Sequence, residues 1–320
     1  MKLIDMHCDT IGKIMDLDKT GDLSENLCSV NLLELKKADS LAQFFACFTY
    51  LGDYTDKGGY EKCYEHALEM ISFLERQENK YSKEISIVKS YEDIINNSSK
   101  GKLSAVVTIE EGGILNGHME RLETLYEKGI RLMTLMWNYE NCLGYPNSKD
   151  SQIMSQGLKP FGIDVVKRMG ELGMIVDISH ASDGSFWDVL KYAKGPVVAS
   201  HSNCRALCNH PRNLSDEMIR ALAERGGVSG LNLYGVFLGT ASESRIDEMV
   251  AHIQHMIQIG GSEFPAIGTD FDGFRGMDVM EIEKISDMEK LWYALKNKGL
   301  SEGQLEKIWN GNVLRILKEM

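Results

Sequence analysis

The chain has 320 residues, of which 43% are hydrophobic, enough to form a large buried core. Its formal net charge of −12 argues against a nucleic-acid or anionic-membrane partner, because both require a basic face on the protein. Seven cysteines occur without a CxxC pair, which is typical of reduced thiols in a reducing compartment and argues against a disulfide framework.

The beginning of the chain carries no apolar stretch of the kind found in signal peptides, because charged and metal-binding residue types start at Lys2 and Asp5. No window of the sequence approaches the uninterrupted apolar run that a membrane-spanning helix needs. We therefore expect a cytoplasmic protein with no membrane partner. The sequence leaves the number of associated chains open, with a homodimer as one option.

Short apolar runs recur along the chain, and helical stretches separate most of them. The runs are continuous, as expected of parallel strands that are buried on both faces. Glycines such as Gly129 and Gly173 stand just before a run, where a left-handed residue would close the preceding helix. Strands are predicted near residues 3–7, 42–49, 104–109, 131–136, 174–178, 196–200, 227–231 and 265–269, with helices such as 60–76, 160–172 and 243–259 between them.

Eight strands that alternate with helices predict an α/β fold, a (β/α)8 TIM-type barrel formed as a single domain by residues 1–320. An open doubly wound sheet is the alternative, but no GxGxxG turn follows the first strand. Residues 85–89 are predicted as an extra strand outside the barrel, and residues 139–156 as a long loop over one face.

Imidazoles and carboxylates gather at the ends of the predicted strands, where barrel enzymes place their chemistry. His7 and Asp9 share one side of an extended chain, so they can bind one ion together. His180 and His201 follow neighbouring strands, so they can bind a second ion. This mixture of ligand types suits zinc or a similar divalent ion.

Two further carboxylate positions stand at strand ends. The third strand ends in Glu110 and Glu111, and a carboxylate from this pair could bridge the two ions. The eighth strand is followed by Asp270. By contrast, His252 and His255 lie three apart on a helix of the outer ring, and we interpret them as surface or packing residues.

These motifs together resemble the renal (membrane) dipeptidase family of zinc peptidases, within the amidohydrolase-like metal barrels. The resemblance runs from the first strand to the final helix, and its motifs are specific in combination. They are Asp5-Met6-His7-Cys8-Asp9-Thr10, Glu111-Gly112-Gly113, Gly157-Leu158-Lys159-Pro160-Phe161-Gly162, Asp177-Ile178-Ser179-His180, Ser200-His201-Ser202 and Gly268-Thr269-Asp270-Phe271-Asp272-Gly273.

The resemblance implies a role for each residue. One zinc would be held by His7, Asp9 and Glu111, and the other by Glu111, His180 and His201. Glu111 is preferred over Glu110 as the bridging, catalytic carboxylate because it directly precedes the Gly-Gly pair. Asp270 would contact the metal-bound water and act as general base and then general acid.

Substrate contacts are also implied by the resemblance. Arg212, at the family's spacing beyond His201, would bind the terminal carboxylate of the substrate, although a surface arginine paired with Asp216 or Glu217 is the simpler alternative. Trp137, followed by Asn138, stands where the animal dipeptidases carry a histidine near the reacting carbonyl. This departure bears on substrate range and not on the metal chemistry.

The resemblance implies a zinc-dependent dipeptidase with two divalent ions and a dipeptide substrate, and leaves dipeptides with a C-terminal D-residue open. Similar ligands would serve other amidohydrolase-type enzymes that act on lactones, β-lactams or deaminase substrates. A non-catalytic metal- or peptide-binding relative is the alternative from another class. Asp270 argues against such a relative, because a protein that only binds has no need of a proton shuttle.

Overall fold

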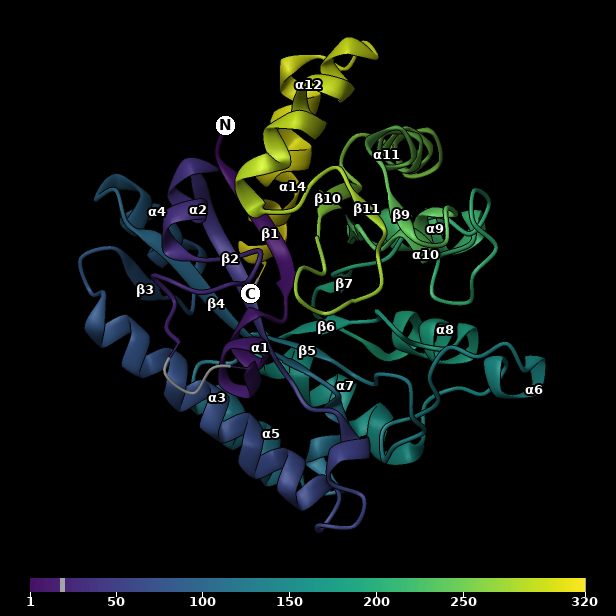
Figure 1. The fold of residues 1–320 in the computed structure, drawn as a ribbon. Helices are drawn as coiled ribbons and strands as arrows, with labels where there is room; N and C mark the ends of the chain where they lie inside the picture. Colours follow the sequence, from purple (N-terminus) through teal and green to yellow (C-terminus); the bar gives the residue numbers. More distant parts are fainter. Residues whose placement is uncertain (18–20, 320) are drawn as a thin grey trace.

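The computed structural model describes residues 1–17 and 21–319 of the chain. Its main feature is a closed barrel of eight parallel strands surrounded by helices (Figure 1). The first barrel strand pairs with the second and with the last, which closes the ring. The barrel strands are β1 (Leu3–Cys8), β2 (Ser40–Phe48), β4 (Leu103–Glu110), β5 (Leu132–Thr134), β6 (Ile175–Asp177), β7 (Val197–Ala199), β8 (Val228–Leu231) and β10 (Pro265–Ile267).

All eight predicted barrel strands are confirmed, and so is the (β/α)8 fold. The extra strand expected at residues 85–89 is β3 (Ile85–Ile87), which pairs with β4 on the outside of the ring. The strands are buried along their whole length, because side chains on one face fill the barrel and those on the other face pack under the helices. A small separate sheet joins β9 (Glu243–Ser244) to β11 (Val279–Met280).

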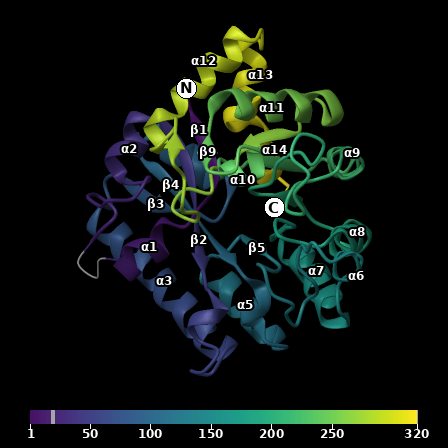
Figure 2. The ribbon, with the colours of Figure 1, turned by 45° about the vertical axis from the view of Figure 1, so that its right-hand side comes forward.

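Helices cover the outside of the barrel in both ribbon views, with the long helix α3 along one side (Figures 1 and 2). The helices are α1 (Thr10–Leu17), α2 (Leu32–Lys37), α3 (Tyr60–Lys80), α4 (Tyr91–Ser99), α5 (Met119–Glu127), α6 (Ser151–Met154), α7 (Pro160–Leu172), α8 (Asp183–Tyr192), α9 (Asp216–Glu224), α10 (Gly235–Leu238), α11 (Ile246–Gly260), α12 (Glu289–Asn297), α13 (Glu302–Glu306) and α14 (Asn312–Leu317). Short 3-10 turns are η1 (Leu51–Asp53), η2 (Gly112–Leu115) and η3 (Ile285–Met288), and η4 (Lys307–Gly311) is a π-helical turn.

Two sequence-based boundaries differ from the structure. The helix expected at 243–259 begins at Ile246, because Glu243 and Ser244 form β9. The loop expected at 139–156 contains the short helix α6, whose first turn is capped by the Asp150 side chain. The predicted left-handed glycine before a strand is present at Gly173, which ends α7 with φ 73°.

The ends of the chain complete the barrel. The turn η4 packs against β1 and β10, so the C-terminal segment lies over the point where the ring closes. Within residues 1–17 and 21–319, no helix combines the length and the apolarity needed to span a membrane.

Candidate active site

The candidate site lies at the carboxyl ends of the barrel strands. His7 lies in β1 and Glu110 is the last residue of β4, whereas His180, His201 and Asp270 follow β6, β7 and β10 by two or three residues. Parallel strands place all their carboxyl ends at one rim of the barrel. The fold therefore brings these side chains together from segments that are far apart in the sequence.

One half of the site consists of His7, Asp9 and Glu110, all buried. His7 Nε2 lies 3.3 Å from Asp9 Oδ2 and 3.3 Å from Glu110 Oε2. Both ring nitrogens of His7 are buried without a hydrogen-bond partner, as is Asp9 Oδ1. Buried polar atoms are normally satisfied by a hydrogen bond, so His7 and Asp9 present donor atoms suited to a metal ion.

The other half consists of Glu110, His180 and His201. Glu110 Oε1 lies 3.1 Å from His180 Nε2 and 3.6 Å from His201 Nε2. Glu110 thus turns one carboxylate oxygen to each half of the site. Both groups could hold a metal ion, and for that reason we call His7, Asp9, Glu110, His180 and His201 the metal-ligand cluster.

The two neighbouring glutamates, Glu110 and Glu111, occupy different places in the structure. Glu111, which was predicted to bridge the two ions, turns away from the histidines and accepts hydrogen bonds from Asn141 Nδ2 and from the backbone N–H groups of Gly113 and Trp137. Glu110 takes the central position instead. Glu111 leaves the strand with φ 82°, so proximity to the Gly-Gly pair does not identify the residue that faces the barrel axis.

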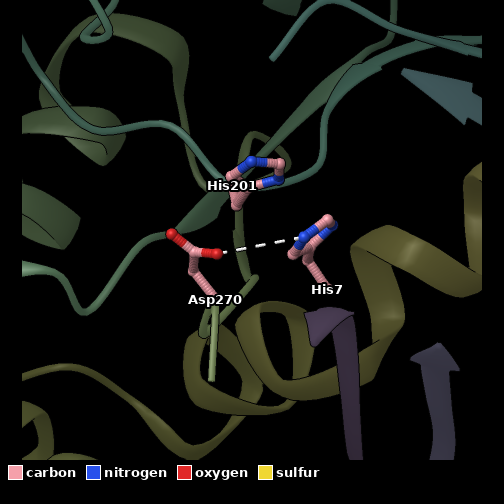
Figure 3. Close-up of side chains that lie close together, drawn as sticks. All are labelled: His7, His201 and Asp270. Carbon is pink, nitrogen blue, oxygen red and sulfur yellow. Dashed lines mark ion pairs between the residues drawn. The ribbon is translucent and has the colours of Figure 1, made fainter. Parts of the chain in front are cut away.

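Asp270 faces the same space as His7 and His201 (Figure 3). Its Oδ1 lies 3.9 Å from His7 Nε2, and its Oδ2 accepts a hydrogen bond of 2.8 Å from Asn232 Nδ2. A Cβ atom at Gly273 would lie 2.3 Å from Asp9 Oδ2 and 2.5 Å from Asp270 Oδ1, so only glycine lets these carboxylates approach.

Two site residues are held in a conformation that L-residues rarely adopt. His180 has φ 69° and Asp270 has φ 61°, both in the left-handed region. Such a residue costs about 1–3 kcal/mol and persists where the surroundings determine its conformation. The strain is consistent with side chains that are directed into a common site.

The imidazole rings of His201 and His180 are each held by a polar contact at Nδ1. His201 Nδ1 lies 2.7 Å from the Ser200 hydroxyl, which donates to Asp177 Oδ2 at 2.6 Å. His180 Nδ1 lies 3.1 Å from Asn138 Oδ1. Partners of this kind select the tautomer in which Nε2 is free to bind a metal.

Charge accumulates in the cluster. Burial raises the pKa of Glu110 to about 8, and the neighbouring carboxylates Asp9 and Asp270 add to the rise while His7 opposes it. Burial likewise raises the pKa of Asp270 to about 6. Burial and nearby positive charge hold the pKa of His180 well below its ordinary value. Burial lowers the pKa of His7, but the Glu110 and Asp9 carboxylates outweigh burial and raise that pKa well above its ordinary value. Carboxylates and imidazoles around one buried space are a donor set that a divalent cation stabilises, with loss of the His7 proton.

Arg212 is buried beside the cluster, with 5% of its surface exposed. It donates from Nη1 to Ser202 Oγ and from Nη2 to the His201 carbonyl, both at 3.1 Å, and its Nε has no partner. The alternative of a surface arginine is wrong, since Asp216 pairs with His255 instead. Within the described residues Arg212 forms no ion pair, so a buried guanidinium is left without a carboxylate.

The cluster opens into a cavity of about 500 Å³. The residues that line it include Glu110, His180, Asp270, Trp137 and Asn138. The Trp137 ring packs against Phe48, Tyr50, Tyr139 and His180, with ring centroids 5.1–6.0 Å apart. The indole is thus part of an aromatic wall beside the cluster.

Several residues of the site were not singled out from the sequence. Glu110 was set aside in favour of Glu111, and Ser200 and Asp177 were only noted as motif members. Asn232, the partner of Asp270, follows β8 and was missed. Its position one residue after the end of a strand is the sequence feature that could have identified it as a site residue. The interpretation of His252 as a packing residue agrees with its burial and its contacts with Cys204 N–H and the Leu238 carbonyl.

A barrel with histidines and carboxylates at its carboxyl rim is the arrangement of a metal-dependent hydrolase. The family model for membrane dipeptidase (peptidase family M19) matches residues 1–320. The chain therefore belongs to the membrane dipeptidase family of metallopeptidases.

Comparisons with individual proteins support the same family. The chain is 31% identical over 257 residues to Dipeptidase 3 of Homo sapiens, covering 79% of this chain and 52% of that protein. It is 29% identical over 313 residues to an uncharacterized dipeptidase of Schizosaccharomyces pombe, covering 93% of this chain and 74% of that protein. Its fold is similar to that of a metallopeptidase from Rhodobacter sphaeroides, with a TM-score of 0.89 and 20% identity, over 100% of this chain and 99% of that one.

Proposed function

We propose that this member of the family hydrolyses dipeptides with two divalent ions, most simply zinc, bound by the metal-ligand cluster. One ion would be held by His7, Asp9 and Glu110, and the other by Glu110, His180 and His201. The observation that carries the proposal is the division of the Glu110 carboxylate, with Oε2 toward His7 and Oε1 toward His180. Imidazole and carboxylate ligands of this number suit zinc.

When bound, the ions supply Lewis acidity, which lowers the pKa of water and polarises the substrate carbonyl. Asp270 is placed at the same space, with Oδ2 held by Asn232 and Oδ1 turned toward His7 Nε2 at 3.9 Å. It would take the proton of the attacking water and return it to the leaving amine. Asn232 would keep the carboxylate turned toward His7 and His201 throughout.

Arg212 would bind the C-terminal carboxylate of the substrate. A planar guanidinium can donate two parallel hydrogen bonds to a carboxylate, and a substrate would supply the direct ion-pair partner that Arg212 does not have among the described residues. The Phe237 ring lies 5.3 Å from the guanidinium and also lines the cavity, so it would guide the carboxylate end. A carboxylate held so near the reacting bond favours dipeptides over longer chains.

Trp137 would contact the other end of the substrate. It lies on the β5 side of the rim, whereas Arg212 follows β7, so a dipeptide fixed at Arg212 would extend toward the indole. Asn138 would act with it by holding His180. Binding of a C-terminal D-residue is part of the proposal, because the Rhodobacter sphaeroides metallopeptidase was solved with a phosphinate mimic of L-Ala-D-Ala.

The test combines metal analysis with turnover. Protein saturated with zinc and freed of excess ion should contain two equivalents per chain and should hydrolyse members of a dipeptide library that includes C-terminal D-residues. Lactones and β-lactams form the comparison arm. Tight binding of dipeptides without hydrolysis, or preferential turnover of a lactone, would contradict the dipeptidase assignment.

The ligand assignment has its own test. Glu110→Gln should lower the zinc content of both sites, because it removes charge from the residue shared by the two halves. Glu111→Gln should leave two equivalents of zinc at saturation, because its carboxylate faces the loop after β5. Opposite results for the two variants would restore Glu111 as the bridging ligand.

A further inference from the structure

Glu111 is a buried carboxylate that the proposed chemistry does not use. It is fully buried beside the ligand Glu110, and within residues 1–17 and 21–319 no Lys, Arg or His side chain forms an ion pair with it. A buried carboxylate is expensive to keep unless several donors satisfy it. Its hydrogen-bond partners therefore show what it does.

Glu111 accepts hydrogen bonds from three donors in the described part of the chain. Oε1 accepts from Gly113 N–H at 2.8 Å and from Asn141 Nδ2 at 2.6 Å, and Oε2 accepts from Trp137 N–H at 2.9 Å. Trp137 and Asn141 belong to one segment, residues 135–147, which follows β5 and which we call the β5 loop. Glu111 thus joins the end of β4 to two points of the β5 loop.

The surrounding backbone is shaped for this contact. Glu111 has φ 82°, a conformation that disfavours any residue other than glycine. A Cβ atom at Gly113 would lie 2.3 Å from Glu111 Oε1, and one at Gly112 would lie 2.8 Å from the Leu135 carbonyl oxygen. The two glycines therefore allow the Glu111 carboxylate and the β5 loop to approach the backbone closely.

The β5 loop in turn holds His180. Asn138 Oδ1 lies 3.1 Å from His180 Nδ1. Asn147 donates from its backbone N–H to the His180 carbonyl at 2.7 Å, and its Nδ2 lies 3.3 Å from Asn138 Oδ1. The residue next to the Glu111-bound amide, Asn138, is thus the one that fixes the His180 ring.

We propose that Glu111 is a positioning residue, which anchors the β5 loop so that Asn138 orients the His180 imidazole and Trp137 forms the cavity wall. The second half of this proposal rests on the proposed role of His180 as a metal ligand. The first half, the anchoring of the loop, concerns the chain alone and can be measured in protein without metal.

A carboxylate suits this position better than an amide. Glutamine has one acceptor oxygen, and its NH2 group would face Trp137 N–H or the donors at Gly113 and Asn141. Glu111→Gln therefore leaves at least one buried donor without an acceptor while the side chain keeps its size. The substitution tests the hydrogen bonds and not the packing.

The experiment measures amide hydrogen exchange of metal-free protein, with peptides that cover residues 135–147, in wild type and Glu111→Gln. We expect exchange in this segment to be about tenfold faster in the variant, as for the loss of one buried hydrogen bond, with peptides from α9 and α11 unchanged. Competition with a chelator should show zinc bound about 10- to 100-fold more weakly at one of two sites.

Ile253→Val in α11 is the control, because it trims a buried side chain far from the β5 loop. It should lower stability while leaving both the exchange of residues 135–147 and the zinc affinity at wild-type values. If Glu111→Gln behaves like this control, the positioning role is wrong. Loss of one whole equivalent of zinc at saturation in Glu111→Gln would also contradict the positioning role, because it would show that Glu111 is itself a ligand.

Two further variants keep the proposal testable if Glu111→Gln folds poorly. Glu111→Gly removes the carboxylate and relieves the positive φ, so it should be folded yet show the same fast exchange and weak zinc binding. Asn138→Ala removes the contacts of Asn138 with His180 and with Asn147 but leaves the hydrogen bonds of Glu111, so it should weaken zinc binding without faster exchange in residues 139–144. Wild-type exchange in Glu111→Gly would refute the anchoring. Faster exchange with unchanged zinc affinity would refute only the link to His180.

Discussion

Replacement of Arg212 by alanine separates a dipeptidase from a general metal hydrolase. The guanidinium is 5% exposed and uses two of its five N–H donors, toward Ser202 Oγ and the His201 carbonyl. The proposed function assigns the remaining donors to a substrate carboxylate. Hydrogen bonds to charged groups contribute about 1.5–3 kcal/mol each, so two of them amount to roughly 3 kcal/mol or more.

A loss of that size corresponds to a fall of about 100-fold or more in kcat/KM for a dipeptide. The C-terminal amide of the same dipeptide lacks the charge, so Arg212→Ala should cost it no more than about tenfold, through the lost contacts to Ser202 and His201. Arg212→Lys should recover only part of the dipeptide activity, because a lysine ammonium lacks the planar fork.

The assay compares kcat/KM for the acid and the amide in wild type and variants. Arg205→Ala is the matched control, because Arg205 lies in the same loop but binds Asp183 through two hydrogen bonds of 2.8 Å. It should affect both substrates equally and weakly. Equal losses for acid and amide in Arg212→Ala would show that this arginine only supports the loop, and the preference for dipeptides would need another explanation.

Three other perturbations have defined outcomes. Asp270→Asn should lower kcat by about 10²- to 10⁴-fold with two zinc equivalents retained, and near-native turnover would remove Asp270 from proton transfer. Zinc binding to metal-free protein at pH 7 should release protons, because the pKa of Glu110 is raised to about 8 and that of His7 is raised as well, and the release should decline as pH rises through the pKa values of the pair. Calorimetry in buffers of different ionisation enthalpy measures this release, and identical heats in all of them would contradict it. Trp137→Ala should raise KM roughly tenfold for dipeptides with a large N-terminal side chain, as for loss of about 1.5 kcal/mol of apolar contact, and a uniform effect on glycyl and phenylalanyl dipeptides would argue against the contact.

The sequence by itself determined the architecture. Short continuous apolar runs are typical of strands that are buried on both faces. The alternation of these strands with helices indicates a parallel barrel. Once the strands are known, their carboxyl ends are known, and four of the five members of the metal-ligand cluster follow: His7, Asp9, His180 and His201. These residues could be found because their distance from a strand end is short and their chemistry is distinctive.

Only the tertiary structure shows which of Glu110 and Glu111 faces the histidines. Neighbouring residues of identical type cannot be separated by composition, and side chains of successive strand residues point in opposite directions. The register of β4, in which Glu110 lies opposite Phe48 of β2, directs Glu110 to the histidines. The positive φ of Glu111 then turns its carboxylate to the β5 loop.

The burial of Arg212 and the support of the histidines were also decided by the tertiary structure. Whether a loop arginine meets solvent or the cluster depends on how the segment after β7 packs, which no local pattern encodes. The contacts of Asn138 with His180 and of Ser200 with His201 join loops from different strands. Local sequence specifies which groups reach the rim of the barrel, whereas their pairing there depends on distances that arise only when the ring has closed.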